Sequence, residues 1–136
     1  MKKILVDSGP LIALFDGKDK YHEASVAFVK ANQFELVTTL ASITETHYML
    51  DFSARAQFDF LGWVSAGAVR LEPIAANDLQ TIRERIKKYS DLPMDFADAC
   101  LVFLAEKLNI NSIATIDNDF EIYKFKGKKS FTTLVK

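Results

Sequence analysis

The sequence predicts an α/β protein with a parallel β-sheet, because short aliphatic runs alternate with longer segments whose apolar residues recur at helical spacing. A chain of 136 residues with 49% hydrophobic and 26% charged residues fits one soluble globular domain, residues 1–136, around a single core. No internal repeat, low-complexity tract or linker interrupts this pattern.

The amino-terminal half opens with an expected strand at Lys3–Val6, a β-rich run that ends at Asp7. Ser8 is the expected N-cap, and Pro10 a first-turn residue, of a helix that runs to about Phe15. The elements expected next are a helix at 20–32, a strand at 35–38, helices at 41–51 and 53–66, the second ended by Gly67, and a strand at 69–71.

In the carboxyl-terminal half, Asn77 is the expected cap of a helix at 78–90 whose apolar residues recur at i+3 and i+4. A nearly uninterrupted apolar helix is expected at 95–109, with Asp95 as its N-cap and Asp98 in its first turn. A strand at 112–116, a lysine-rich loop at 123–129 and a last strand at 130–135 complete the pattern.

Charge and cysteine content narrow the function classes. The formal net charge of −1 argues against a protein that is basic overall, although a local basic groove stays compatible with it. Cys100 is the only cysteine, so an internal disulfide is excluded and a reducing cytoplasm is the expected location. The longest apolar run, 99–105, is too short to span a bilayer, so we expect no membrane association.

Carboxylates are expected to gather at one edge of the sheet. Asp7 and Asp117 follow strands, and in parallel α/β sheets ligands bind beyond the carboxyl ends of the strands. Asp98 enters from the first turn of the helix that precedes the second of these strands, and Glu45 lies on the helix after the 35–38 strand. Clustered carboxylates raise one another's pKa unless a cation lies between them. Because CxxC and HExxH are absent, an all-oxygen site for Mg²⁺ or Mn²⁺ is the coherent metal site.

Each of these acids also has a structural alternative. Asp7 alone could serve a turn or a cap, Glu45 could be a solvated helix residue, and Asp95 with Asp98 resembles a helix-capping pair. Their joint placement at strand ends and helix starts favours a functional site. Phosphotransfer folds of the dehalogenase or receiver type would need a further acid next to Asp7, and nucleotide-binding glycine motifs are absent.

Four ordered stretches, VDSGPLIAL, TTLASITETHYML, MDFADACLVFLAE and IATIDNDF, resemble the PIN-domain proteins, which include the VapC-type toxins. The resemblance covers essentially the whole chain. It implies a three-layer α/β/α sandwich with a central parallel β-sheet, and a Mg²⁺- or Mn²⁺-dependent ribonuclease that leaves a 5′-phosphate. The one departure is Gly9-Pro10, where other residues are more usual in the family; it concerns the shape of the first loop, not the acid.

Carried over by position, the resemblance assigns Asp7, Glu45, Asp98 and Asp117 as the catalytic acids. Asp7, Asp98 and Asp117 would hold the principal metal ion, Asp119 a second one, and Glu45 would complete the site or orient the attacking water. The auxiliary residues it implies are Ser8, Asp95 and Thr115.

The lysines Lys124, Lys126, Lys128 and Lys129 are expected to hold RNA phosphates, with Tyr123 or Phe125 stacking on a base; a solvated loop is the alternative. The resemblance implies a homodimer and, for a toxin, an antitoxin whose tail masks the acids. Aromatic residues around Phe58 cannot all share one helix face, so some are expected to be exposed. A non-catalytic PIN-like module that binds RNA or protein is the alternative function.

Overall fold

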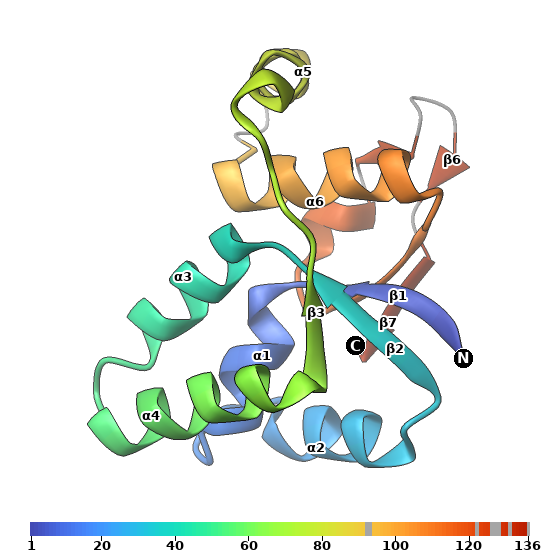
Figure 1. The fold of residues 1–136 in the computed structure, drawn as a ribbon. Helices are drawn as coiled ribbons and strands as arrows, with labels where there is room; N and C mark the ends of the chain where they lie inside the picture. Colours follow the sequence, from blue (N-terminus) through green and yellow to red (C-terminus); the bar gives the residue numbers. More distant parts are fainter. Residues whose placement is uncertain (92–93, 122, 126–128, 131, 136) are drawn as a thin grey trace.

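The computed structural model describes residues 1–91, 94–121, 123–125, 129–130 and 132–135; for 121, 124–125, 129–130 and 132–134 the backbone alone is described. In this part of the chain, parallel strands form a five-stranded sheet with the order β3-β2-β1-β4-β7 (Figure 1). Its strands are β1 (Lys2–Val6), β2 (Phe34–Thr38), β3 (Val69–Leu71), β4 (Ser112–Thr115) and β7 (Thr132–Val135). The prediction of an α/β fold with a parallel sheet is therefore confirmed.

Alternating side chains of the strands build a hydrophobic core on each face of the sheet. In β1, Leu5 joins one buried cluster, while Ile4 and Val6 join the other. The register continues this division, because Leu5 pairs with Val37 of β2 and Ile4 pairs with Leu36. A strand that is buried on both faces contains consecutive apolar residues, which explains why apolar residues follow one another in the KILV and ELV segments.

Helices cover both faces of the sheet, giving the expected three-layer α/β/α sandwich (Figure 1). One face packs against α5 (Leu79–Lys88) and α6 (Phe96–Leu108). The other packs against α1 (Ser8–Phe15), α2 (His22–Ala31), α3 (Leu40–Met49) and α4 (Ala54–Trp63). The Arg85 side chain of α5 forms an ion pair with Glu106 of α6, which ties the two outer helices together.

Helix α6 has a capped N-terminus and a buried middle. Asp95 is its N-cap, and Asp95 Oδ1 accepts a hydrogen bond of 2.8 Å from the Asp98 backbone N–H, as predicted. Residues 99–102 are fully buried, among them the free thiol of Cys100. The helix ends at Asn109, whose φ of 56° provides the left-handed conformation that closes many helices. Burial along α6 therefore fixes the position of its first turn, where Asp98 lies.

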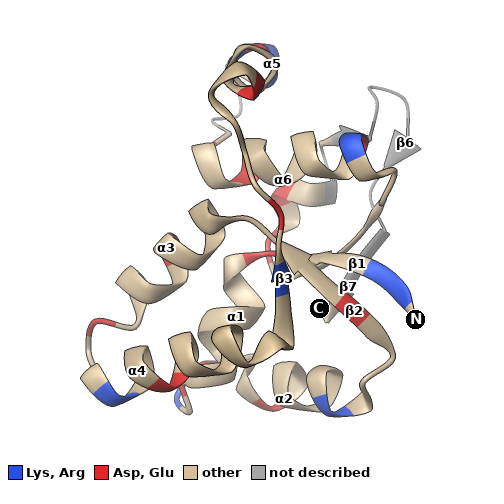
Figure 2. Ribbon diagram, in the orientation of Figure 1, with Lys and Arg blue, Asp and Glu red and all other residues tan. Residues whose placement is uncertain are grey.

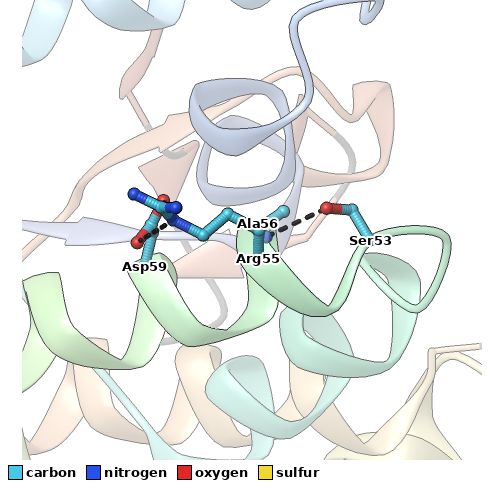
Figure 3. A network of polar contacts seen from close by, with 4 residues as sticks. All are labelled: Ser53, Arg55, Ala56 and Asp59. Atoms are coloured by element: carbon cyan, nitrogen blue, oxygen red, sulfur yellow. Dashed lines mark hydrogen bonds and ion pairs between the residues drawn. The ribbon is translucent and has the colours of Figure 1, made fainter.

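Helix α4 is stabilised by contacts within itself rather than by deep burial. Ser53 Oγ accepts a hydrogen bond of 3.1 Å from the Ala56 N–H, and Arg55 Nε contacts both carboxylate oxygens of Asp59 at 3.1 Å (Figure 3). The short π-helix η1 (Val64–Ala68) follows, and Gly67 ends it with a φ of 98°, so the predicted stop at Gly67 is confirmed. Phe60 is buried, while Phe58 is 75% exposed, as expected for aromatic residues that cannot share one face.

Two predicted caps are wrong. Helix α1 is capped by Asp7 and not by Ser8, because Asp7 Oδ1 accepts the Ser8 backbone N–H at 2.8 Å. Asn77 does not cap α5, since it lies inside a 3₁₀ turn, η2 (Ala76–Asp78), that precedes the helix. The N-cap position of α5 is Asp78, whose carboxylate accepts the Ala75 N–H at 2.8 Å within the turn and makes no capping bond to α5.

The carboxyl-terminal segment also departs from expectation. Its predicted loop contains the strand β5 (Lys124–Phe125), which pairs antiparallel with β6 (Lys129–Ser130) in a separate two-stranded sheet. The single strand expected at 130–135 is therefore wrong at its start, and its last part is β7, paired parallel with β4. Within the described ranges, no helix is both long and apolar enough to cross a membrane.

Candidate active site

The candidate site lies where the strand order reverses. From β1 the chain adds β2 and β3 on one side, and it later places β4 and β7 on the other side. At such a switch point, ligands of parallel α/β sheets bind in the crevice beyond the carboxyl ends of the neighbouring strands. Asp7 follows β1 directly and Asp117 follows β4 after one intervening residue, so the topology places both carboxylates at this crevice.

A third carboxylate reaches the same point from helix α6. Asp7, Asp98 and Asp117 each offer one carboxylate oxygen, and these oxygens all lie within 4.8 Å of one another. Asp7 is 4% exposed and Asp98 is 6% exposed, whereas Asp117 is half-buried. In Figure 2 acidic positions accordingly occur near the middle of the view, between α1 and α6. The structure thus brings together three of the acids that the sequence singled out.

Hydrogen bonds hold both oxygens of Asp7. Oδ1 accepts the Ser8 N–H at 2.8 Å, and Oδ2 accepts the hydroxyl of Thr115 at 3.0 Å. The same Thr115 hydroxyl accepts the Asp117 N–H at 2.9 Å, which orients the turn that carries Asp117. The backbone N–H of Asp7 also donates to the Ala114 carbonyl at 3.0 Å. Thr115 therefore connects two of the three clustered acids.

Tyr123 supports Asp98, and the sequence prediction for this tyrosine is wrong. Its ring is fully buried and cannot stack on an RNA base. Its hydroxyl instead donates a hydrogen bond of 3.2 Å to Asp98 Oδ2. Sequence reasoning assigned Tyr123 to an exposed loop because it follows a polar turn and precedes the lysines. The signal it missed is the spacing of Phe120 and Tyr123, which places both rings in the core beside α6.

Glu45 approaches the cluster from α3 through Ser8. The Ser8 hydroxyl donates a short hydrogen bond to Glu45 Oε1, joining the starts of α1 and α3. The Glu45 carboxylate is near enough to Asp7 to raise the pKa of that acid. Glu45 itself is half-buried and lines an open cavity with Tyr48, Asp95 and Phe96. It therefore faces the side from which a solvent molecule or a substrate can enter.

Burial and mutual repulsion disfavour the ionised acids. Burial raises the pKa of Asp98 to about 8, with the charges of Asp7, Asp95 and Asp117 adding to the shift. Burial likewise raises the pKa of Asp7 to about 6, against the lowering effect of its hydrogen bonds from Ser8 and Thr115. The carboxylates at this edge of the sheet are thus held close together at a cost in free energy that a cation would relieve.

The donor set fits a hard divalent cation. Three carboxylate oxygens within 4.8 Å can share one ion, and oxygen ligands are those that Mg²⁺ and Mn²⁺ prefer. Backbone and hydroxyl donors occupy part of each buried carboxylate, which leaves further lone pairs free for an ion. Burial, with the charges of Asp7, Asp95 and Asp117 added, raises the pKa of Asp98, and a positive charge at this point would lower that pKa again.

The remaining predicted acids surround the three clustered ones. The Asp119 N–H donates to Asp117 Oδ1 at 2.9 Å, and burial, followed by the charge of Asp117, raises the pKa of Asp119. Asp119 is half-buried and lies beside Asp117, outside the 4.8 Å group. Asp95 is exposed and acts through the N-cap contact with Asp98.

The predicted phosphate-binding lysines lie largely outside the described residues. Lys126 and Lys128 belong to the segment 126–128, and only the backbone of Lys124 and Lys129 is described, in β5 and β6. Their assignment stays a prediction.

Gly9, the residue at which the first motif departs from the usual family pattern, packs against the end of β4. A Cβ atom added at Gly9 would lie 2.6 Å from Ile116 Cγ1, far inside normal contact. The start of α1 therefore rests directly on the residue that precedes Asp117. This close packing brings the Asp7 and Asp117 segments together.

Comparison with known proteins places this arrangement in a family. The PIN domain model matches residues 4–126. Ribonuclease VapC26 of Mycobacterium tuberculosis (strain ATCC 25618 / H37Rv) is 25% identical over 134 residues, covering 96% of this chain and 99% of that protein. The crystal structure of VapC20 from Mycobacterium tuberculosis, described as a sarcin-ricin loop cleaving toxin, superposes with a TM-score of 0.82 at 21% identity, covering 90% of this chain and 96% of that one.

A more distant likeness is to the crystal structure of FitAcB from Neisseria gonorrhoeae, with a TM-score of 0.54 at 16% identity, covering 85% of this chain and 88% of that one. At these identities the solved structures support the fold alone. The family model covers most of the chain, including the strands and the helix that carry Asp7, Asp98 and Asp117. On this match and on its fold, the chain belongs to the PIN-domain family.

Proposed function

We propose that the chain is a divalent-metal-dependent endoribonuclease that hydrolyses RNA phosphodiester bonds, and that it acts as the toxin of a toxin–antitoxin pair. The observation that carries the proposal is the convergence of Asp7, Asp98 and Asp117 within 4.8 Å at the sheet's switch point. Membership of the PIN-domain family supports it, as does the name of one similar protein, a ribonuclease.

In this proposal Asp7, Asp98 and Asp117 hold the principal Mg²⁺ or Mn²⁺ ion, and Asp119 contributes to a second position. Such an ion, when bound, stabilises negative charge on the phosphodiester and acidifies water. Glu45 orients the attacking water, because Ser8 occupies Oε1 and leaves the other oxygen able to accept a hydrogen bond. The water oxygen forms the new bond to phosphorus, the bond to the 3′ oxygen breaks, and the products carry a 5′-phosphate and a 3′-hydroxyl.

Exposed aromatic side chains next to Glu45 can bind unpaired RNA bases. Tyr48 is 69% exposed and Phe96 is 50% exposed, and both line the cavity that contains Glu45. Aromatic rings hold single-stranded RNA by stacking on its bases without regard to sequence. These rings take the stacking role that the buried Tyr123 cannot fill, while the predicted lysines would hold phosphates.

We further propose a homodimer and a cytoplasmic location, where RNA and a cognate antitoxin are both available. The dimer proposal rests on apolar side chains exposed in the connection between α3 and α4 and along α4, with Phe52 60%, Phe58 75% and Leu61 44% exposed. Exposed patches of this kind are unusual on monomers and typical of interaction surfaces.

The direct test is cleavage of RNA by the purified protein. We expect cleavage with Mg²⁺ or Mn²⁺ and none with EDTA, and Asp98→Asn should abolish it. Asp51→Asn is the matched control, because Asp51 is an exposed carboxylate outside the cluster. Full activity in Asp98→Asn would contradict the assignment. The alternative, a non-catalytic binding module, predicts that divalent ions do not raise the melting temperature.

A further inference from the structure

Tyr123 is a buried hydroxyl donor aimed at one of the clustered acids. Its side chain is fully buried, and its hydroxyl lies 3.2 Å from Asp98 Oδ2. Burial, followed by the nearby Asp98 carboxylate, raises the pKa of Tyr123 above its usual value, so the hydroxyl keeps its proton. The hydroxyl is therefore available as a donor to the Asp98 carboxylate.

The Tyr123 ring is held by packing against two other aromatic rings and by a backbone hydrogen bond. Phe120 packs edge-on at a centroid distance of 5.2 Å, and Tyr89, the C-cap residue of α5, packs edge-on at 5.0 Å. The Tyr123 N–H also donates to the Asp119 carbonyl at 3.1 Å. Tyr123 thus connects the turn that carries Asp117 and Asp119 to the helix that carries Asp98.

The two most buried acids are supported in the same way. Asp7 receives the Thr115 hydroxyl on Oδ2, and Asp98 receives the Tyr123 hydroxyl on Oδ2. Partners of this kind fix the rotamer of a metal-binding carboxylate and the direction of its free lone pairs. One carboxylate oxygen of Asp98 lies within 4.8 Å of an oxygen of Asp7 and of Asp117, so the orientation of the Asp98 carboxylate decides whether all three can share an ion.

We propose that Tyr123 is a positioning residue that orients Asp98 toward Asp7 and Asp117, so that the affinity of the acidic cluster for a divalent ion depends on the Tyr123 hydroxyl. The inference rests on the proposed metal site and adds to it a residue that contacts neither the ion nor the RNA. Loss of an outer partner of this type typically weakens metal binding by about 10- to 100-fold.

The experiment compares Tyr123→Phe with the wild-type protein in Mn²⁺ binding, measured by calorimetry or electron paramagnetic resonance without RNA. The ring and its packing are retained in this variant, and only the hydroxyl is lost. We expect Mn²⁺ affinity to fall by about 10-fold or more. In RNA cleavage, the Mn²⁺ concentration for half-maximal activity should rise by the same factor, while kcat at saturating Mn²⁺ changes little.

Thr46→Val is the matched control. Thr46 is fully buried beside Glu45, and its hydroxyl donates to the Ser42 carbonyl at 2.8 Å rather than to an acid. The Thr46→Val variant loses one buried hydroxyl contact, as Tyr123→Phe does, and should bind Mn²⁺ with the affinity of the wild type. Circular dichroism and a melting curve for each variant verify that both remain folded.

The inference is overturned if Tyr123→Phe binds Mn²⁺ with wild-type affinity, or if Thr46→Val weakens binding equally. A wild-type protein that binds no Mn²⁺ also overturns it. A protein that binds Mn²⁺ in a Tyr123-dependent manner yet cleaves no RNA would instead contradict the proposed function and leave this inference standing.

Discussion

The Thr115 hydroxyl donates a hydrogen bond of 3.0 Å to Asp7 Oδ2, although 108 positions separate the two residues in the sequence. The same hydroxyl accepts the Asp117 N–H at 2.9 Å, so one side chain orients two acids at the ends of neighbouring strands. A hydroxyl can both donate and accept, which a valine of nearly the same shape cannot.

We therefore expect Thr115→Val to lower the free energy of unfolding by about 1–3 kcal/mol, because it leaves a buried carboxylate and a backbone N–H without their partner. The measurement is urea unfolding in EDTA, so that no metal contributes. Thr115→Ser keeps the hydroxyl and should lose less stability than Thr115→Val. Equal losses in the two variants would show that the methyl group, not the hydrogen bonds, matters here.

The stability of the metal-free protein should fall as the pH rises. Folding raises the pKa of Asp98 from 3.8 to about 8 and that of Asp7 from 3.8 to about 6. Below pH 3.8 both states are protonated; above it the unfolded chain ionises first, which favours unfolding until the folded pKa is passed. The loss attributable to these acids thus spans about pH 4 to 8 and then levels off.

This dependence is measured by urea unfolding in EDTA across that pH range. Asp98→Asn removes the group with the highest pKa of the pair, so it should flatten the part of the curve between pH 6 and 8. Added Mn²⁺ should stabilise the wild type more at pH 8 than at pH 5, because ions bind the ionised carboxylates. Parallel curves for the wild type and Asp98→Asn would contradict the assignment of the shift to Asp98.

Asp95 is the N-cap of α6 and Asp98 lies three residues later in its first turn, and the two should respond differently to mutation. Asp95→Ala removes the N-cap contact with the Asp98 N–H and should cost about 1 kcal/mol of stability. Asp95→Asn retains a capping oxygen and should cost only a few tenths of a kcal/mol. The free energies of unfolding of Asp95→Ala and Asp95→Asn are compared by chemical denaturation at one pH. A larger loss for Asn than for Ala would indicate that the charge of Asp95, and not its capping contact, is the important property.

The exposed rings beside Glu45 allow a test of base stacking. Tyr48→Ala and Phe96→Ala should each raise the KM for a single-stranded RNA by about tenfold, since stacking contributes about 1–3 kcal/mol per base. The effect on kcat should be small, because neither ring belongs to the cluster of Asp7, Asp98 and Asp117. Leu71→Ala removes an exposed apolar side chain from β3, outside this cavity and outside the proposed dimer surface, and should leave KM unchanged. An unchanged KM in both Tyr48→Ala and Phe96→Ala would exclude these rings as the binding site of the RNA bases.

Local patterns in the sequence predict much of this site because each acid is tied to a strong local signal. Asp7 and Asp117 follow aliphatic strands, and Asp98 follows a good N-cap at the start of an apolar helix. The topology that unites them depends only on parallel strands returning to one edge. The three-layer arrangement, by contrast, was implied by family resemblance and not by periodicity.

The parts that were mispredicted depend on contacts distant in sequence. Asp7 and Ser8 are both good capping residues, and the choice between them is made by the contact of Ser8 with Glu45 on α3. Tyr123 follows a polar turn, and its burial becomes evident only when α5 and α6 are packed beside it. The pairing of β5 with β6 likewise joins very short strands that carry little sequence signal of their own.

The contact between Gly9 and Ile116 has a consequence for how this fold can vary. The two positions share one small volume, since a side chain at 9 would occupy the place of the isoleucine. We therefore expect Gly9→Ala to be destabilising alone and to be rescued when Ile116 is also shortened to alanine, which removes the Cγ1 atom that the added methyl group would meet. Across relatives, a larger residue at the first position should accompany a smaller one at the second. On this expectation, the glycine in the first motif and the isoleucine just before Asp117 would vary together.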